Sequence, residues 1–287
     1  MQPEDKFASI GNYTLHYQQV GTGTQTVVLL HGIPTNTFLW HGVTPYLAEV
    51  YEVIVPDLLG YGLSDRADSE ELGLTKQAKH ISALLDTINI KQAHFVGHDL
   101  GGGIAQILAV NYPECVASMI VADGVCFANW PLPKVGAMRW PTAPEFEPGT
   151  ALIRQMLRGG VYNPEVLTPK VMEAFTAPFA TPSGPEELKR CSLGLDHYQT
   201  EDIVPGLPNI KVPVTLLWGQ HDPYTTPYWG KRLHETIPHS KLEILPDCGH
   251  YSMLDNPDLF AQEVLKHLSA ATGAVGVRDG SVVAGRN

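Results

Sequence analysis

Asp99 stands where a nucleophile is expected. Residues 97–101 read G-H-D-L-G, after an apolar run typical of a strand and before a helical pattern. Small residues on either side permit a sharp strand-to-helix turn that exposes the central side chain, and the free N–H groups of the helix favour negative charge there. In such a turn an aspartate serves either as a nucleophile or as the N-cap of the helix. These five residues alone leave both interpretations open.

Two further residues follow Asp99 in an informative order. Asp222 follows an apolar run in W-G-Q-H-D, and His250 follows the last such run in D-C-G-H. Nucleophile, acid and histidine in this chain order are typical of one class of catalytic triad. A second aspartate, Asp123, ends the apolar run after the turn and is the alternative acid.

With H-G-I-P at 31–34 and D-L-L-G-Y-G-L-S-D at 57–65, these motifs make the chain resemble α/β-hydrolases with a helical cap, over about residues 7–268. Asp99 in place of serine resembles the branch of epoxide hydrolases and haloalkane dehalogenases. The resemblance implies that Asp222 orients His250, while some dehalogenase-like relatives carry the acid at the place of Asp123. It also implies an oxyanion hole made by the backbone N–H groups of Ile33 and Leu100.

An aspartate nucleophile predicts displacement at a saturated carbon. A carboxylate is already charged near neutral pH, whereas serine must first lose a proton to histidine. Attack of a carboxylate on an ester carbonyl would give a reactive anhydride, but attack on an sp3 carbon that bears a leaving group gives a stable alkyl ester. His250 would then activate the water that hydrolyses this ester and regenerates Asp99.

The leaving group is either an epoxide oxygen or a halide. The resemblance implies cap tyrosines over the nucleophile for an epoxide, and Tyr162 and Tyr198 are the candidates. For a halide it implies a tryptophan after the nucleophile and often an asparagine in the H-G-x-P loop, where this chain has Leu100 and Ile33. Two other tryptophans, Trp130 and Trp140, are the candidates for an indole N–H that holds a halide. We therefore expect a small apolar epoxide, with a haloalkane as the alternative.

A role without hydrolysis stays open as a third alternative: a ligand-binding protein, or an enzyme that promotes a rearrangement in a biosynthetic pathway. The presence of Asp99, Asp222 and His250 together argues for catalysis. It does not exclude a reaction in which water takes no part.

The elements that must position these residues follow an alternating pattern. We expect a hairpin over 7–20 that turns at Gly11 and Asn12, and further strands at 26–32, 51–57, 93–99, 116–123, 213–219 and 241–246. Helical spacing over 74–88, 102–112 and 257–268 separates them. Strands that alternate with helices predict an α/β fold with a mostly parallel eight-stranded sheet flanked by helices.

The pattern changes between residues 126 and 208, where prolines are frequent, strand patterns are absent and short helical patterns occur at 151–157 and 186–193. We call 126–208 the cap segment and expect an inserted helical cap. The core is then expected over 1–125 and 209–269. The small, Gly-rich residues 270–287 predict a flexible tail.

Composition limits the partners. With 19 Lys and Arg against 30 Asp and Glu, the formal net charge of −11 argues against binding to nucleic acid or to an anionic membrane surface. We expect a small-molecule substrate and no metal or organic cofactor. The absence of a signal-peptide pattern and four scattered cysteines favour a cytoplasmic protein. The sequence does not define the oligomeric state, for which a dimer is one candidate.

Overall fold

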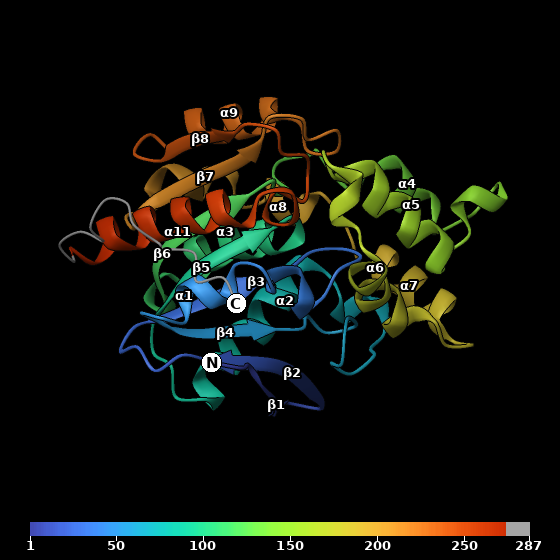
Figure 1. The fold of residues 1–287 in the computed structure, drawn as a ribbon, viewed down its shortest axis with the longest axis horizontal. Coiled ribbons are helices and arrows are strands. Elements are labelled where there is room, and N and C mark those ends of the chain that lie inside the picture. Colours follow the sequence, from blue (N-terminus) through green and yellow to red (C-terminus); the bar gives the residue numbers. More distant parts are fainter. Residues whose placement is uncertain (274–287) are drawn as a thin grey trace, which may run out of the picture.

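One mixed β-sheet runs through the centre of the protein (Figure 1). The computed structural model describes residues 1–273, and within them the sheet has eight strands in the order β1-β2-β4-β3-β5-β6-β7-β8. Strands β1 and β2 pair antiparallel and β2 joins β4 antiparallel, whereas all other neighbours are parallel. The predicted α/β fold with a mostly parallel eight-stranded sheet is confirmed. The strands are β1 (Glu4–Ile10), β2 (Tyr13–Val20), β3 (Thr26–Leu30), β4 (Glu52–Pro56), β5 (Ala93–His98), β6 (Val116–Ala122), β7 (Val214–Gly219) and β8 (Lys241–Leu245).

Helices cover the sheet and fill the cap segment. Those of the core are α1 (Thr44–Leu47), α2 (Leu74–Thr87), α3 (Leu100–Asn111), α9 (Pro227–Thr236), α10 (Ser252–Asp255) and α11 (Pro257–Thr272). Those of the cap segment are α4 (Pro133–Ala137), α5 (Thr150–Gly160), α6 (Pro169–Thr176), α7 (Gly184–Leu193) and α8 (Tyr198–Glu201). Short 3₁₀ helices lie at Thr37–Trp40, Ser69–Glu71, Pro113–Cys115, Pro144–Phe146, Pro164–Val166, Ala177–Phe179 and Val204–Asn209.

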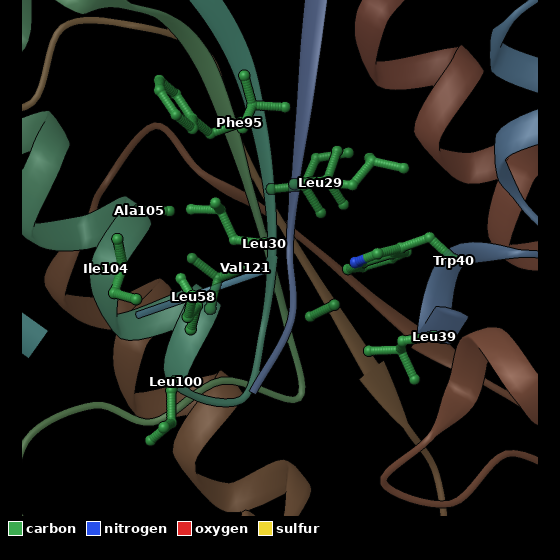
Figure 2. Packing of buried hydrophobic residues seen from close by; sticks show 14 of the residues in the cluster. Leu29, Leu30, Leu39, Trp40, Leu58, Phe95, Leu100, Ile104, Ala105 and Val121 are labelled. Atoms are coloured by element: carbon green, nitrogen blue, oxygen red, sulfur yellow. The ribbon is translucent and has the colours of Figure 1, made fainter. Parts of the chain in front are cut away.

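Apolar side chains pack on both faces of the sheet, which explains the continuous apolar runs of the inner strands. Figure 2 shows Leu29 of β3 on the side of Leu39 and Trp40, while Leu30 points to the opposite side, toward Ile104 of α3. Because α3 begins directly after β5 and packs on this second face, the turn between the two elements is held rigidly by the core.

The cap segment enters between β6 and β7, and its described residues form helices and turns without a strand. Figure 1 places α4, α5, α6 and α7 together at one side of the molecule, beyond the carboxyl ends of the parallel strands. The parallel strands β3, β5, β6 and β7 all end at this edge of the sheet, so the loops that follow them begin side by side. Residues far apart in the sequence therefore meet under the cap helices.

The C-terminal helix extends further than expected. Helix α11 continues to Thr272, and Gly273 ends it with a left-handed φ of 66°. A glycine in this conformation is a common helix C-cap, so the expected boundary at residue 269 falls inside the helix. The predicted flexible tail otherwise falls on residues 274–287, outside the described residues. Among residues 1–273, no helix is long and apolar enough to cross a membrane.

Candidate active site

Asp99 occupies a tight turn between β5 and α3. Its φ of 50° is in the left-handed region, which costs energy for a residue other than glycine. The turn brings backbone segments so close that a Cβ on Gly97 would lie 2.1 Å from the carbonyl oxygen of Gly101. The side chain of Asp99 makes no capping hydrogen bond to α3. Asp99 therefore stands at the N-cap position of α3, but its side chain does not cap the helix.

The carboxylate of Asp99 instead turns toward the loop after β3. The backbone N–H of Ile33 donates a hydrogen bond to Asp99 Oδ2 over 2.9 Å, and the N–H of Leu100 also stabilises the carboxylate. A Cβ on Gly32 would lie 2.2 Å from the same oxygen, so glycine is required at this approach. The structure thus brings both predicted oxyanion-hole residues to Asp99.

His250 lies beside Asp99 and is held by Asp222. Its Nδ1 is 3.0 Å from Asp222 Oδ2. The hydroxyl of Thr225 donates to this carboxylate oxygen over 2.7 Å. On the other side, Nε2 of His98 donates to the backbone oxygen of His250 over 2.8 Å. Asp99, Asp222 and His250 are each at most 5% exposed.

Asp123 is close to this group but binds other partners. One of its carboxyl oxygens accepts from the N–H of Gly219 over 2.7 Å and the other from Ser252 Oγ over 2.6 Å. Burial and the nearby charge of Asp222 raise the pKa of Asp123 well above its usual range. Burial also opposes ionisation of Asp222, but the charge of His250 and the hydrogen bonds keep its pKa below the ordinary value. The negative charge of this pair is therefore more favourable on Asp222 than on Asp123.

The electrostatics of the pair Asp99 and His250 follow from burial and mutual attraction. Burial raises the pKa of Asp99 to about 6, although His250 and the two backbone N–H groups counteract this rise. Burial disfavours the imidazolium, but Asp222 and then Asp99 raise the pKa of His250 to about 9. Near neutral pH an ionised Asp99 therefore faces a protonated His250.

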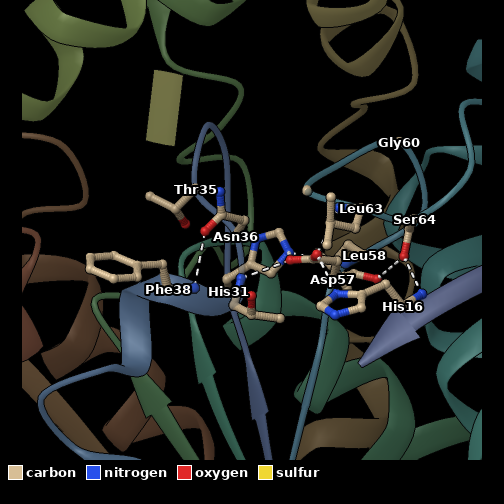
Figure 3. A network of polar contacts seen from close by, with 12 residues as sticks. His16, His31, Thr35, Asn36, Phe38, Asp57, Leu58, Gly60, Leu63 and Ser64 are labelled. Carbon is tan, nitrogen blue, oxygen red and sulfur yellow. Dashed lines mark hydrogen bonds and ion pairs between the residues drawn. The ribbon is translucent and has the colours of Figure 1, made fainter. Parts of the chain in front are cut away.

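A buried polar network supports the loop that carries Ile33 (Figure 3). His31 Nδ1 donates to the oxygen of Gly32 over 2.9 Å, and its Nε2 accepts from the N–H of Leu58 over 3.0 Å, so its tautomer is defined and its ring is neutral. Asp57 accepts from the N–H of Thr37 over 2.8 Å and binds His16 Nδ1 at 2.7 Å. The H-G-I-P loop is thereby joined to the loop after β4.

A mostly apolar cavity opens above Asp99. The cavity is small and lies next to the carboxylate and to His250. The cap segment contributes a large part of its wall. The lining residues are Ile33, Asp99, Leu100, Val125, Trp130, Pro131, Leu132, Val135, Met156, Leu195, Tyr224, His250 and Tyr251.

Three of the four predicted pocket residues lie away from this cavity. Trp140, Tyr162 and Tyr198 are 74%, 47% and 60% exposed. Tyr162 stacks on His221 with ring centroids 4.8 Å apart. Tyr198 is the first residue of α8 and lies on the exposed side of this helix, whereas Thr200 lies on its buried side. Their assignment to the pocket was wrong because the orientation of the short cap helices was not known.

Trp130 lines the cavity as expected, but its indole N–H is already used. Nε1 of Trp130 donates to Thr200 Oγ1 over 2.7 Å, and Thr200 donates in turn to the oxygen of Phe127. Trp130 therefore offers no free N–H to a halide, and Trp140 lies outside the cavity.

Two tyrosines were missed by sequence reasoning. Tyr224 and Tyr251 both line the cavity, and their rings lie edge-on to His250 with centroids 5.2 and 5.0 Å away. Both could have been considered from the motifs, because Tyr224 follows Asp222 by two positions and Tyr251 directly follows His250. Their proximity in sequence to the triad was the signal.

Known proteins share this architecture. The family model for the alpha/beta hydrolase fold matches residues 25–257. A 2-hydroxy-6-oxo-6-phenylhexa-2,4-dienoate hydrolase of Burkholderia cepacia is 27% identical over 91% of this chain and 93% of its own length. A cis-3-alkyl-4-alkyloxetan-2-one decarboxylase of Shewanella oneidensis is 30% identical over 91% of this chain and 86% of its own length.

Among solved structures, a haloalkane dehalogenase from Bradyrhizobium elkani superposes with a TM-score of 0.84 at 22% identity, covering 95% of this chain and all of the other. At this identity the likeness concerns the fold alone. An alpha/beta hydrolase fold protein from Burkholderia ambifaria has a TM-score of 0.83 at 26% identity and covers 91% and 97% of the two chains. The chain belongs to the alpha/beta hydrolase fold family.

Proposed function

We propose that this protein is a hydrolase in which Asp99 attacks a saturated carbon of a small apolar epoxide and forms an alkyl ester, which water then hydrolyses. The observation that carries the proposal is the position of the Asp99 carboxylate: one oxygen accepts from the Ile33 N–H, and the side chain faces an apolar cavity beside His250. A carboxylate in this position suits displacement at carbon better than attack on an acyl group.

The arrangement supports a division of labour between the two carboxylate oxygens. Oδ2 is engaged by the Ile33 N–H, so Oδ1 is the oxygen available for attack. In the second step, water attacks the ester carbonyl, and the charge that develops on Oδ2 meets donors that are already in place. No cofactor takes part in either step.

The first step also changes the role of His250. In the resting protein the negative charge of Asp99 contributes to the raised pKa of His250. Formation of the ester removes this charge, which lowers the pKa of His250 and allows its proton to leave. His250 then becomes the base that activates water, with Asp222 still holding Nδ1.

Two observations favour an oxygen leaving group over a halide. The positions next to the nucleophile, Leu100 and Ile33, have no side-chain donor, and the indole N–H of Trp130 is bound to Thr200. A departing halide would find neither of the side-chain donors that the resemblance to haloalkane dehalogenases implies, so the haloalkane alternative has less support.

The test is to trap the ester in His250→Ala. This variant is incubated with a panel of epoxides and matched bromoalkanes, and intact-protein mass spectrometry follows the adduct. Loss of the imidazolium removes an attraction that lowers the pKa of Asp99, so the reaction is run at about pH 8, where Asp99 stays ionised.

We expect an increase equal to the whole mass of the epoxide, and no adduct in the control His250→Ala/Asp99→Asn. An adduct from bromoalkanes only, lighter by hydrogen bromide, would support the dehalogenase alternative. No adduct with any compound would overturn the proposal.

A non-hydrolytic reaction is the second candidate, because the 30% identical relative is named as an oxetan-2-one decarboxylase. Attack of Asp99 on the saturated ring carbon next to oxygen would release the ring carboxylate. Loss of CO2 would then form a C=C bond and expel Asp99, without water. Gas chromatography of the products from a cis-3,4-dialkyl oxetan-2-one distinguishes the two: an alkene supports decarboxylation, and a hydroxy acid supports hydrolysis.

A further inference from the structure

The cavity contains few side chains that can donate a hydrogen bond to a substrate. Apart from His250, the described lining residues with a donor are Trp130, Tyr224 and Tyr251. The Trp130 N–H binds Thr200 Oγ1, and the Tyr224 hydroxyl donates to the backbone oxygen of Met156 over 2.7 Å. Both of these donors are therefore committed to the cap segment.

The hydroxyl of Tyr251 differs from them. Across residues 1–273 the structure records no hydrogen bond for it, yet it is not among the polar atoms sealed inside the protein, as the hydroxyl of Tyr61 is. Since Tyr251 is only 1% exposed and lines the cavity, its hydroxyl can meet only a molecule inside that cavity. An uncommitted donor at this place points to a ligand acceptor.

Packing fixes the ring that carries this hydroxyl. The ring lies 5.0 Å from the centroid of His250 and 5.5 Å from that of His98. A Cβ on Gly160 would lie 2.5 Å from Tyr251 Cε2, so the backbone of α5 presses directly against the ring edge. A side chain held on three sides in this way is oriented before any substrate binds.

The surroundings also keep the phenol in its neutral form. Burial raises the pKa of Tyr251 well above 10, and the charges of Tyr224, Asp99 and Asp222 add to the rise. A neutral phenol is a donor, and it is a stronger acid than the alcohol that forms when the alkoxide of an opened epoxide takes up a proton. The proton therefore moves toward the ring oxygen as this oxygen leaves.

We propose that Tyr251 is the acid that protonates the leaving oxygen of a strained cyclic ether while Asp99 attacks the ring carbon. The inference rests on the proposed function. Asp99 Oδ1 forms the new C–O bond, the ring C–O bond breaks with its electron pair on oxygen, and this oxygen takes the Tyr251 proton. Tyr251 regains its proton from the His250 imidazolium, and His250 is protonated again by the hydrolytic water that it activates, so the resting protein is restored and the net reaction is epoxide plus water to diol.

The experiment compares rates of ester formation in the His250→Ala background. Tyr251→Phe keeps the ring that packs on Gly160 and removes only the hydroxyl. Tyr61→Phe is the matched control, because it removes a buried tyrosine hydroxyl outside the cavity. In a third protein, 3-fluorotyrosine replaces Tyr251 and provides a more acidic phenol in the same shape.

We expect Tyr251→Phe to slow ester formation from an epoxide by about 100-fold or more, as for loss of a general acid. The fluorotyrosine protein is expected to stay within about tenfold of its parent, since it still carries an acid. Tyr61→Phe is expected to leave the rate unchanged.

Equal rates for His250→Ala with and without Tyr251→Phe would overturn the role of Tyr251 and leave the proposed function intact. Equal slowing by Tyr251→Phe and by fluorotyrosine would also overturn it, since a packing role would then account for the loss. Absence of any adduct in His250→Ala itself is a different result, because it overturns the proposed function and the inference with it.

Discussion

At the scale of single residues, Asp99 has two opposing properties. Burial opposes ionisation and raises its pKa to about 6, while attack on carbon requires the ionised form. His250 and the backbone N–H groups of Ile33 and Leu100 partly offset this effect of burial, because they stabilise the negative charge. The nucleophile is thus charged at neutral pH but poorly solvated, which makes a carboxylate more reactive.

The first prediction concerns the cost of this charge. The pKa of Asp99 lies above its ordinary value of 3.8, so folding disfavours the ionised carboxylate above about pH 6, and this cost disappears as the pH falls from 6 to 3.8. We expect Asp99→Asn to lose activity and to gain up to about 3 kcal/mol in the free energy of unfolding at pH 8. Urea unfolding of both proteins at several pH values measures this difference in the free energy of unfolding. A stabilisation by Asp99→Asn that persisted below about pH 4 would contradict this explanation.

The second prediction separates the two buried acids. Asp222 carries the charge that holds His250 Nδ1, so Asp222→Asn should lower kcat by about 10³-fold or more. The surroundings disfavour a charge on Asp123, and an amide can accept from Gly219 and donate to Ser252, so Asp123→Asn should stay within about tenfold of the parent. Steady-state kinetics with one substrate compares both variants, and the reverse order would exchange their roles.

At the scale of elements, the site depends on three chain segments that approach within van der Waals contact. Helix α3 starts directly behind Asp99, the loop after β3 lies against its carboxylate, and the loop after β8 supplies His250. Asp57 joins the second of these loops to the one after β4 (Figure 3). Because the loops are joined by buried hydrogen bonds, their geometry is stable before a substrate arrives.

The third prediction tests this close approach. A methyl group on Gly32 would lie 2.2 Å from Asp99 Oδ2, so Gly32→Ala must displace the carboxylate or the loop. We expect kcat to fall by about 100-fold with a folded protein. Gly136→Ala is the control, since nothing lies within 4 Å of its added methyl group in α4. Kinetics and circular dichroism on both variants measure the effect; equal activities would mean that the loop adjusts freely.

At the scale of the whole molecule, the cap segment closes the cavity and must stay attached to the core. Arg66 provides one attachment: its guanidinium binds Glu187 of α7 at 2.9 Å and donates to the oxygens of Gly60 and Pro178. This link joins the loop after β4 to the cap helices. The size and access of the cavity therefore depend on residues far from Asp99.

The fourth prediction follows from this link. Arg66→Ala should destabilise the attachment of the cap by about 1–2 kcal/mol, since hydrogen bonds to a charged group are lost. Amide hydrogen exchange should speed up in α6 and α7 and change little in β5 and β6. Lys266→Ala, which breaks only exposed ion pairs with Glu243 and Glu263, serves as the control. Uniform acceleration across the core would indicate global destabilisation instead.

Periodicity and local motifs in the sequence were sufficient for the order of strands along the chain, the class of fold and the positions of Asp99, Asp222 and His250. Buried parallel strands need continuous apolar runs, and a nucleophile turn needs small residues at fixed places. Short stretches of sequence are therefore enough to predict both features. Short helices such as α6 and α9 were missed, since tertiary contacts stabilise them more than their own length and pattern do.

The tertiary structure alone decided which side chains face the cavity and which polar groups remain free. Trp140, Tyr162 and Tyr198 are on the outer side of the cap segment, whereas Tyr224 and Tyr251 face His250. The direction of a side chain on a short helix or loop depends on how that segment packs against others, and no local spacing encodes it. For the same reason only the folded protein distinguishes the committed N–H of Trp130 from the uncommitted hydroxyl of Tyr251.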